Sequence, residues 1–153
     1  MNIISLETAV GCAVLILIVG GYERIYRIPK WFENPPHSFG LIAIQTKKST
    51  VFWIPVQVLF IVALITAIIT NWQFENVRIY LLAALGCFVA VAALTGAYFV
   101  KEILTFSKMP ETTPLTPQLK KRAQNWLKWT TVRNVLQAAS LVFLVVALTK
   151  SKI

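Results

Sequence analysis

The stretch TPQLKKRAQNWLKWTTVRNVLQAASLVFLVVALTK, residues 116–150, decides the fold of this chain. Thr116 and Pro117 have the residue types preferred at a helix N-cap and at the first helical position. Nothing after them breaks a helix before Leu148. At 1.5 Å per residue such a helix would be about 48 Å long, whereas the hydrocarbon core of a bilayer is about 30 Å thick. We therefore expect a membrane span over residues 126–148, preceded by helical turns that extend beyond the membrane.

The composition of the chain is typical of a membrane protein. Of its 153 residues, 57% are hydrophobic and 14% are charged, whereas soluble domains carry roughly 25% charged residues. Fifteen Lys and Arg residues against six Asp and Glu give a net charge of +9. A nucleic-acid-binding protein would gather its basic residues on a soluble face, but here they lie between apolar segments, as in membrane-protein loops. We expect membrane lipid as a partner, and no nucleic acid.

Three further apolar stretches predict an all-α, up-down-up-down bundle of four membrane helices in a single domain. The expected spans cover about residues 3–22, 51–70, 77–99 and 126–148. The first lacks a basic leader region and a small-residue cleavage site, so we interpret it as a retained helix and not a signal peptide. Residues 23–50 and 100–125 are expected to be loops. In the first loop Pro29, Pro35 and Pro36 should interrupt regular helix.

The basic residues also predict the orientation of the bundle. Most lysines and arginines fall in residues 23–50 and 100–133, and few fall near the termini or between the second and third spans. Cytoplasmic loops of membrane proteins carry this excess of positive charge. We therefore expect both basic loops in the cytoplasm, the fourth helix extended into it, and both termini outside. The membrane would be an inner or plasma membrane.

Polar side chains gather toward the expected cytoplasmic half and predict a ligand pocket there. On the fourth span Arg133, Asn134 and Gln137 share one face, since residues three and four apart lie on the same side of a helix. Polar groups at membrane depth are costly and usually face protein or water. The candidate ligand-binding residues are Arg133, Asn134, Gln137, Gln57, Tyr98 and Trp129. Arg133 would be the fixed cation of this pocket.

Simpler explanations stay open for these polar groups. Arg133 follows Trp129 by one turn and is shallow enough for its guanidinium to reach the lipid headgroups. Gln137 lies deeper, and a hydrogen bond to another helix would satisfy it. Glu23 and Glu102 are candidate proton acceptors beside the pocket. Each also has a cation nearby in the sequence, Arg24 or Arg27 for Glu23 and Lys101 for Glu102, which favours a solvated ion pair.

Small residues mark one face of the third span. Gly86, Ala90, Ala93 and Ala97 recur at steps of three and four residues. In a membrane such a face lets another helix approach closely. It therefore predicts helix packing, either within the chain, in a homo-oligomer or with a membrane partner protein.

Metal and cofactor chemistry has little basis in this sequence. His37 is the single histidine, and Cys12 and Cys87 lie in separate apolar segments without a CxxC motif. Zinc, haem and di-iron centres need several His, Cys or carboxylate ligands. We expect no metal and no cofactor, and no residue can be assigned a catalytic role.

The layout of the spans resembles that of a known family. The third span ends in Tyr98-Phe99-Val100-Lys101-Glu102-Ile103, and the fourth is introduced by Trp126-x-x-Trp129-x-x-x-Arg133-Asn134. In these features the chain resembles the small four-helix membrane proteins grouped with the anthrone oxygenases, mostly of unknown function. The resemblance covers residues 98–134 best. It implies a cofactor-free, oxygenase-like fold for lipophilic substrates, although no histidine lies near the motif to accept a proton from a phenol.

Two functions from different classes follow from these observations. In the first, the protein binds or modifies a small lipophilic molecule in a cytoplasm-facing pocket. In the second, it is a non-catalytic accessory or assembly subunit of a membrane complex. A transporter ranks third, because after Glu7 no acidic residue lies within an expected span.

Overall fold

The computed structural model describes residues 3–151, and those residues form helices and connections without any strand. The elements are α1 (Ile3–Tyr22), η1 (Glu23–Arg27), α2 (Ile28–Trp31), η2 (His37–Phe39), α3 (Gly40–Thr70), α4 (Glu75–Leu94), η3 (Thr95–Phe99), α5 (Val100–Ser107) and α6 (Pro117–Ser151). The short segments η1 and η3 are π-helical, and η2 is a 3₁₀-helix.

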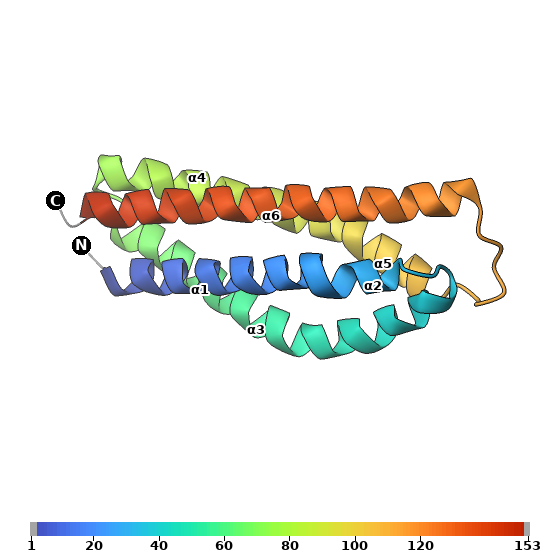
Figure 1. Ribbon diagram of the computed structural model, residues 1–153. Helices are drawn as coiled ribbons and strands as arrows, with labels where there is room; N and C mark the ends of the chain where they lie inside the picture. Colours follow the sequence, from blue (N-terminus) through green and yellow to red (C-terminus); the bar gives the residue numbers. More distant parts are fainter. Residues whose placement is uncertain (1–2, 152–153) are drawn as a thin grey trace.

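The elements join into four helices that are long and apolar enough to cross a membrane. They cover Ile3–Trp31, His37–Thr70, Glu75–Ser107 and Pro117–Ser151. Figure 1 shows the four helices along a common direction, with successive helices antiparallel and with both ends of the described chain at one end of the bundle. The prediction of an all-α chain with four apolar helices of membrane-spanning length is confirmed.

The helices are longer than the sequence predicted, and the expected loops are correspondingly short. Residues 23–31 continue the first helix, and α3 begins at Gly40 in place of residue 51. Pro29 does not end the helix because it lies in the first turn of α2, where a missing backbone donor is tolerated. The third helix likewise continues through α5 as far as Ser107. The prediction of loops was therefore wrong for residues 23–31, 40–50 and 100–107, whereas the helical turns from Pro117 were expected.

The first turns of α6 do not project beyond the other three helices. Its early residues Leu119 and Ala123 are buried, because the other three helices extend at the same end of the bundle (Figure 1). We call this end, which holds the connections at residues 32–36 and 108–116, the loop end. The opposite end, near Ile3 and Ser151, is the terminal end.

Two hydrophobic clusters hold the four helices together. The aliphatic core occupies the half toward the terminal end and consists of Leu6, Ala9, Cys12, Ala13, Ile16, Phe60, Ala63, Leu64, Ala67, Ile68, Val77, Leu81, Ala84, Leu144 and Ala147. The aromatic cluster occupies the loop end and consists of Ile28, Trp31, Phe39, Ile42, Phe99, Phe106, Leu119 and Trp126. This second cluster explains the longer helices, since six of its eight members lie in the segments that were expected to be loops.

The small-residue face of the third helix points away from the rest of the chain. Gly86, Ala90, Ala93 and Ala97 are all exposed, and a Cβ atom added at Gly86 would meet nothing within 4 Å. The buried residues of α4 are Val77, Leu81, Ala84 and Val91, on the side that α6 covers. Within residues 3–151, therefore, the small-residue face does not mediate helix packing.

Candidate functional site

A cavity of about 520 Å³ lies between α3, the third helix and α6. Its walls are formed by Glu23, Trp53, Gln57, Phe88, Val91, Ala92, Thr95, Gly96, Val100, Arg133 and Gln137. We call it the central cavity. Its volume falls within the range of roughly 300 to 1,000 Å³ that is typical of small-molecule sites.

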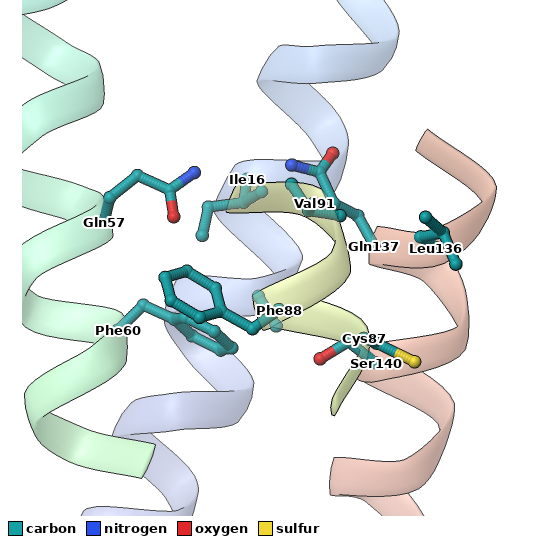
Figure 2. Close-up of a pocket in the computed structure, with 10 residues that line it drawn as sticks. Ile16, Gln57, Phe60, Cys87, Phe88, Val91, Leu136, Gln137 and Ser140 are labelled. Carbon is teal, nitrogen blue, oxygen red and sulfur yellow. The ribbon is translucent and has the colours of Figure 1, made fainter. Parts of the chain in front are cut away.

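Two smaller cavities continue the central cavity along the bundle axis. Toward the loop end, a chamber of about 120 Å³ shares Glu23, Trp53 and Arg133 with it. The other walls of this polar chamber are Ile28, Trp31, Thr46, Ser49, Thr50, Ile103 and Trp126. Toward the terminal end, a narrow apolar cleft of about 20 Å³ reaches Ile16, Phe60, Cys87 and Leu136, as Figure 2 shows. The space therefore changes from polar to apolar along its length.

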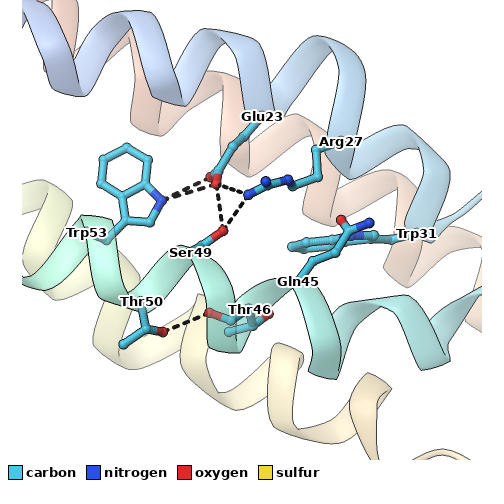
Figure 3. Close-up of polar contacts among 8 residues, drawn as sticks. All are labelled: Glu23, Arg27, Trp31, Gln45, Thr46, Ser49, Thr50 and Trp53. Atoms are coloured by element: carbon cyan, nitrogen blue, oxygen red, sulfur yellow. Dashed lines mark hydrogen bonds and ion pairs between the residues drawn. The ribbon is translucent and has the colours of Figure 1, made fainter.

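Glu23 lies at the boundary between the central cavity and the polar chamber, and its side chain is held by α3 (Figure 3). It accepts hydrogen bonds from Arg27 Nη1 at 2.8 Å, Ser49 Oγ at 2.9 Å and Trp53 Nε1 at 3.2 Å. The residue is 8% exposed. The pairing with a nearby arginine was predicted, but the prediction that the pair is solvated was wrong. A buried carboxylate needs such partners because its desolvation is costly.

The two π-helical segments lie on opposite sides of the central cavity. Glu23 begins η1, and Thr95 and Gly96 begin η3; all three line the cavity. Single π-helical turns within α-helices are rare and occur frequently at functional sites. No residue pattern in the sequence marks these turns, so sequence reasoning missed the wall that they form.

Arg133 is turned into the bundle. Its guanidinium carbon lies 4.8 Å from the centre of the Phe99 ring, and the residue lines both the central cavity and the polar chamber. Its Nε atom is buried and has no hydrogen-bond partner in the protein. This placement favours the interpretation of Arg133 as a pocket cation over a side chain that extends to the lipid headgroups.

The amide side chains have separate positions around the space. Gln57 of α3 and Gln137 of α6 lie on different walls of the central cavity (Figure 2), and Gln137 Oε1 is buried without a partner. Asn134 does not line the three cavities. Its Nδ2 donates to the Gly20 carbonyl at 3.3 Å, which connects α6 to α1.

Tyr98 and Trp129 also do not line the three cavities. The Tyr98 ring lies 6.2 Å from the rings of Trp126 and Trp129 and 5.3 Å from that of Phe99. Trp129 is 42% exposed. Both residues therefore pack on the outside of the aromatic cluster. Trp126, in contrast, is buried and lines the polar chamber together with Trp31. Sequence reasoning treated Trp126 only as part of the motif that introduces the fourth span.

Several buried polar atoms at these cavities lack a hydrogen-bond partner within residues 3–151. They are Thr46 Oγ1 and Trp126 Nε1 in the polar chamber, Arg133 Nε, and Gln137 Oε1 in the central cavity; Asn134 Oδ1 is a further such atom beside Gly20. More than nine in ten buried polar groups in folded proteins are hydrogen-bonded. The walls thus present donors and acceptors to whatever fills the space.

Other charged residues form pairs away from this space. Arg122 Nη2 lies 3.0 Å from Glu102 Oε1, so the partner of Glu102 comes from α6 and is not the neighbouring Lys101. His37 lies 4.0 Å from Glu111, with both side chains exposed. Within the described part of the chain, no group of three or more His, Cys, Asp or Glu residues is placed to hold a metal ion.

Comparison with known proteins adds no relative. Neither a family model, nor a curated protein, nor a solved structure matches the chain. The resemblance to the anthrone oxygenase group stays a prediction from the residues. Trp129, Arg133 and Asn134 belong to the motif that carries this resemblance. The structure places Arg133 in the walls of the cavities and places Asn134 and Trp129 outside them.

Proposed function

We propose that this protein binds a small lipophilic molecule in the central cavity. The observation that carries the proposal is the coincidence of a large, mostly apolar space with unpartnered polar atoms of Arg133 and Gln137 in its walls. Ligand sites typically combine apolar walls with a few convergent polar groups that fix the orientation of the ligand.

A lateral opening toward lipid fits this function. Ala92, Gly96 and Val100 line the central cavity and are nevertheless exposed. In a membrane these residues face the hydrocarbon, since they lie on the outer side of an apolar helix. A lipophilic molecule would enter sideways between α3 and the third helix, without crossing water.

The charge distribution supports a membrane orientation with the loop end in the cytoplasm. Basic residues concentrate at this end, at Arg24, Arg27, Lys30, Lys47, Lys48, Lys101, Lys108, Lys120, Lys121, Arg122 and Lys128. By the positive-inside rule this end faces the cytoplasm of an inner or plasma membrane, and both termini lie outside. The polar chamber is then the cytoplasmic end of the binding site.

Binding of the fluorescent dye 1-aminoanthracene to the protein in phosphatidylcholine nanodiscs tests the proposal. Gly96→Phe places a ring at the rim of the central cavity, whereas Gly86→Phe places the same ring on the exposed face of the same helix. We expect dye affinity to fall at least about tenfold in Gly96→Phe only, because the ring excludes the dye. Equal affinities in the two variants would overturn the proposal.

An accessory or assembly role is the second candidate, and the exposed small-residue face favours it. Replacing both Gly86 and Ala90 by leucine would then break a complex that co-purifies with the protein, because close helix approach depends on small residues. An unaltered co-purification profile would contradict this role. Dye binding would be unaffected in either case, so the two candidates are tested independently.

A further inference from the structure

The charges around the cavities do not cancel at Arg133. Glu23 is the one carboxylate among the residues that line the central cavity and the polar chamber. Its Oε1 accepts from Arg27 at 2.8 Å and from Ser49, and Trp53 Nε1 lies 3.2 Å from both carboxylate oxygens. The ion pairs found within residues 3–151 do not include Arg133. Two arginines, Arg27 and Arg133, thus lie around one carboxylate, and the group carries a net positive charge.

The unpartnered donors gather at the same place. Arg133 Nε and Trp126 Nε1 are both buried N–H groups without an acceptor in the protein, and both residues line the polar chamber. An arginine and an indole can only donate hydrogen bonds. Their ligand must therefore supply acceptors, and hydrogen bonds between a guanidinium and an anionic oxygen are about twice as strong as neutral ones.

On the other side of Arg133 from the polar chamber, the walls are mainly apolar. The central cavity continues from it along Phe88, Val91, Ala92 and Val100, and the narrow cleft after it is lined mainly by apolar side chains, with the uncharged Gln57, Gln137 and Ser140 among them. Charged side chains thus lie at one end of the space only. The 120 Å³ of the polar chamber exceeds what a single water molecule needs.

From these observations we infer that the ligand is an anionic amphiphile with an oxygen-bearing head, such as a carboxylate or a phosphate. Its head lies in the polar chamber against Arg133 and Trp126, and its hydrocarbon body fills the central cavity. This inference rests on the proposed function, because it names the chemical class of the molecule bound in that same cavity.

Competition between dodecanoate and dodecanol for the site tests the inference. Each displaces 1-aminoanthracene from the protein in phosphatidylcholine nanodiscs, and the two differ only in the head group. Partitioning into the bilayer also differs between them, so the quantity compared is the ratio of their affinities in the unaltered protein and in Arg133→Gln. We expect this ratio to fall at least about tenfold in Arg133→Gln, because the charged hydrogen bonds to the head are lost.

Trp126→Phe gives a second, milder variant that keeps a ring in the aromatic cluster and removes only the N–H donor. Affinity for dodecanoate should fall several-fold, and affinity for dodecanol should not change. If circular dichroism and gel filtration show that Arg133→Gln does not fold, Trp126→Phe is the variant that tests the inference. An unchanged ratio in every folded variant overturns the inference.

Two further controls separate the possible outcomes. If Gly96→Phe and Gly86→Phe bind the dye equally, the proposed function itself fails; if dye binding behaves as expected but the head group makes no difference, only the present inference fails. Nanodiscs that contain phosphatidylglycerol identify the source of the anion. If dye binding is weaker in these nanodiscs, and this weakening is absent in Arg133→Gln, the anionic head is that of a membrane phospholipid. If dye binding is unchanged and dodecanoate competes as expected, the head is that of a free carboxylate.

Discussion

At the terminal end the helices meet through small side chains, whereas at the loop end they meet through aromatic rings. Ala9, Ala67, Ala84 and Ala147 are completely buried in the aliphatic core, and small residues allow helices to approach closely in a membrane protein. In the aromatic cluster the rings of Phe99 and Trp126 lie 4.7 Å apart. Large, rigid rings keep helix axes apart and fill the space between them only in part.

The central cavity lies where these two modes of packing meet. Phe88 on its terminal side packs against the aliphatic core, and Arg133 on its loop side lies over Phe99. The π-helical turns η1 and η3 fall at this same junction. The comparison predicts that substitutions in the close-packed terminal half cost more stability than substitutions at the junction.

The largest expected effect comes from a substitution that disrupts the close packing of the terminal half. Ala84→Leu forces a larger side chain into a fully buried position and should destabilise the protein by about 3 kcal/mol, since added methylenes in a packed core force backbone shifts. Ala93→Leu on the same helix, which is exposed, should leave stability unchanged. Unfolding in mixed dodecyl maltoside and sodium dodecyl sulfate micelles, followed by circular dichroism, measures both. Equal midpoints would show that the alanine contacts contribute little.

A smaller effect is expected from the polar network at the junction. Glu23→Gln removes the charge that pairs with Arg27, and one amide cannot accept from all three of its donors. We expect a loss of about 2 kcal/mol, since a buried donor left without an acceptor costs about this much. Glu33→Gln, at an exposed position of the loop end, is the matched control. If both variants unfold at the same detergent composition, the Glu23 network is not a structural element.

Much of the fold could be predicted from the sequence, because hydrophobic runs of membrane-spanning length report on helices directly. The loop end could not, since Phe39, Ile42 and Phe106 are helical only through contacts with one another in the aromatic cluster. In the site, Arg133, Gln137 and Gln57 were identified from their polarity within apolar runs. Glu23 was expected in a solvated ion pair and Trp126 was identified only as part of a motif, because their burial depends on helix extensions that the sequence did not reveal.

The smallest expected effect is a difference in stability between alanine substitutions at two glycines, Gly96 and Gly20. A methyl group added at Gly96 points into open space, so Gly96→Ala should raise stability by about 0.5 kcal/mol through the lower entropy of the unfolded chain. At Gly20 the added Cβ would lie 3.4 Å from Asn134 Oδ1 and 3.5 Å from Gln137 Oε1. These are ordinary van der Waals distances, but both oxygens are buried without a hydrogen-bond partner within residues 3–151. The added methyl group would occupy the space from which a water molecule could donate to them. We therefore expect no increase in stability in Gly20→Ala, because this cost offsets the entropic gain expected for Gly96→Ala.

Mixed-micelle unfolding of the two variants on one day, with Gly21→Ala as a third, gives this difference with the required precision. Gly21 is an apt control because it follows Gly20 in the same helix and an added Cβ there meets nothing within 4 Å. Gly21→Ala and Gly96→Ala should both be slightly more stable than the unaltered protein, and Gly20→Ala should not be. A gain at Gly20 equal to the other two would mean that the added methyl group costs nothing at the two buried oxygens, and that neither oxygen needs a hydrogen-bond donor at that place.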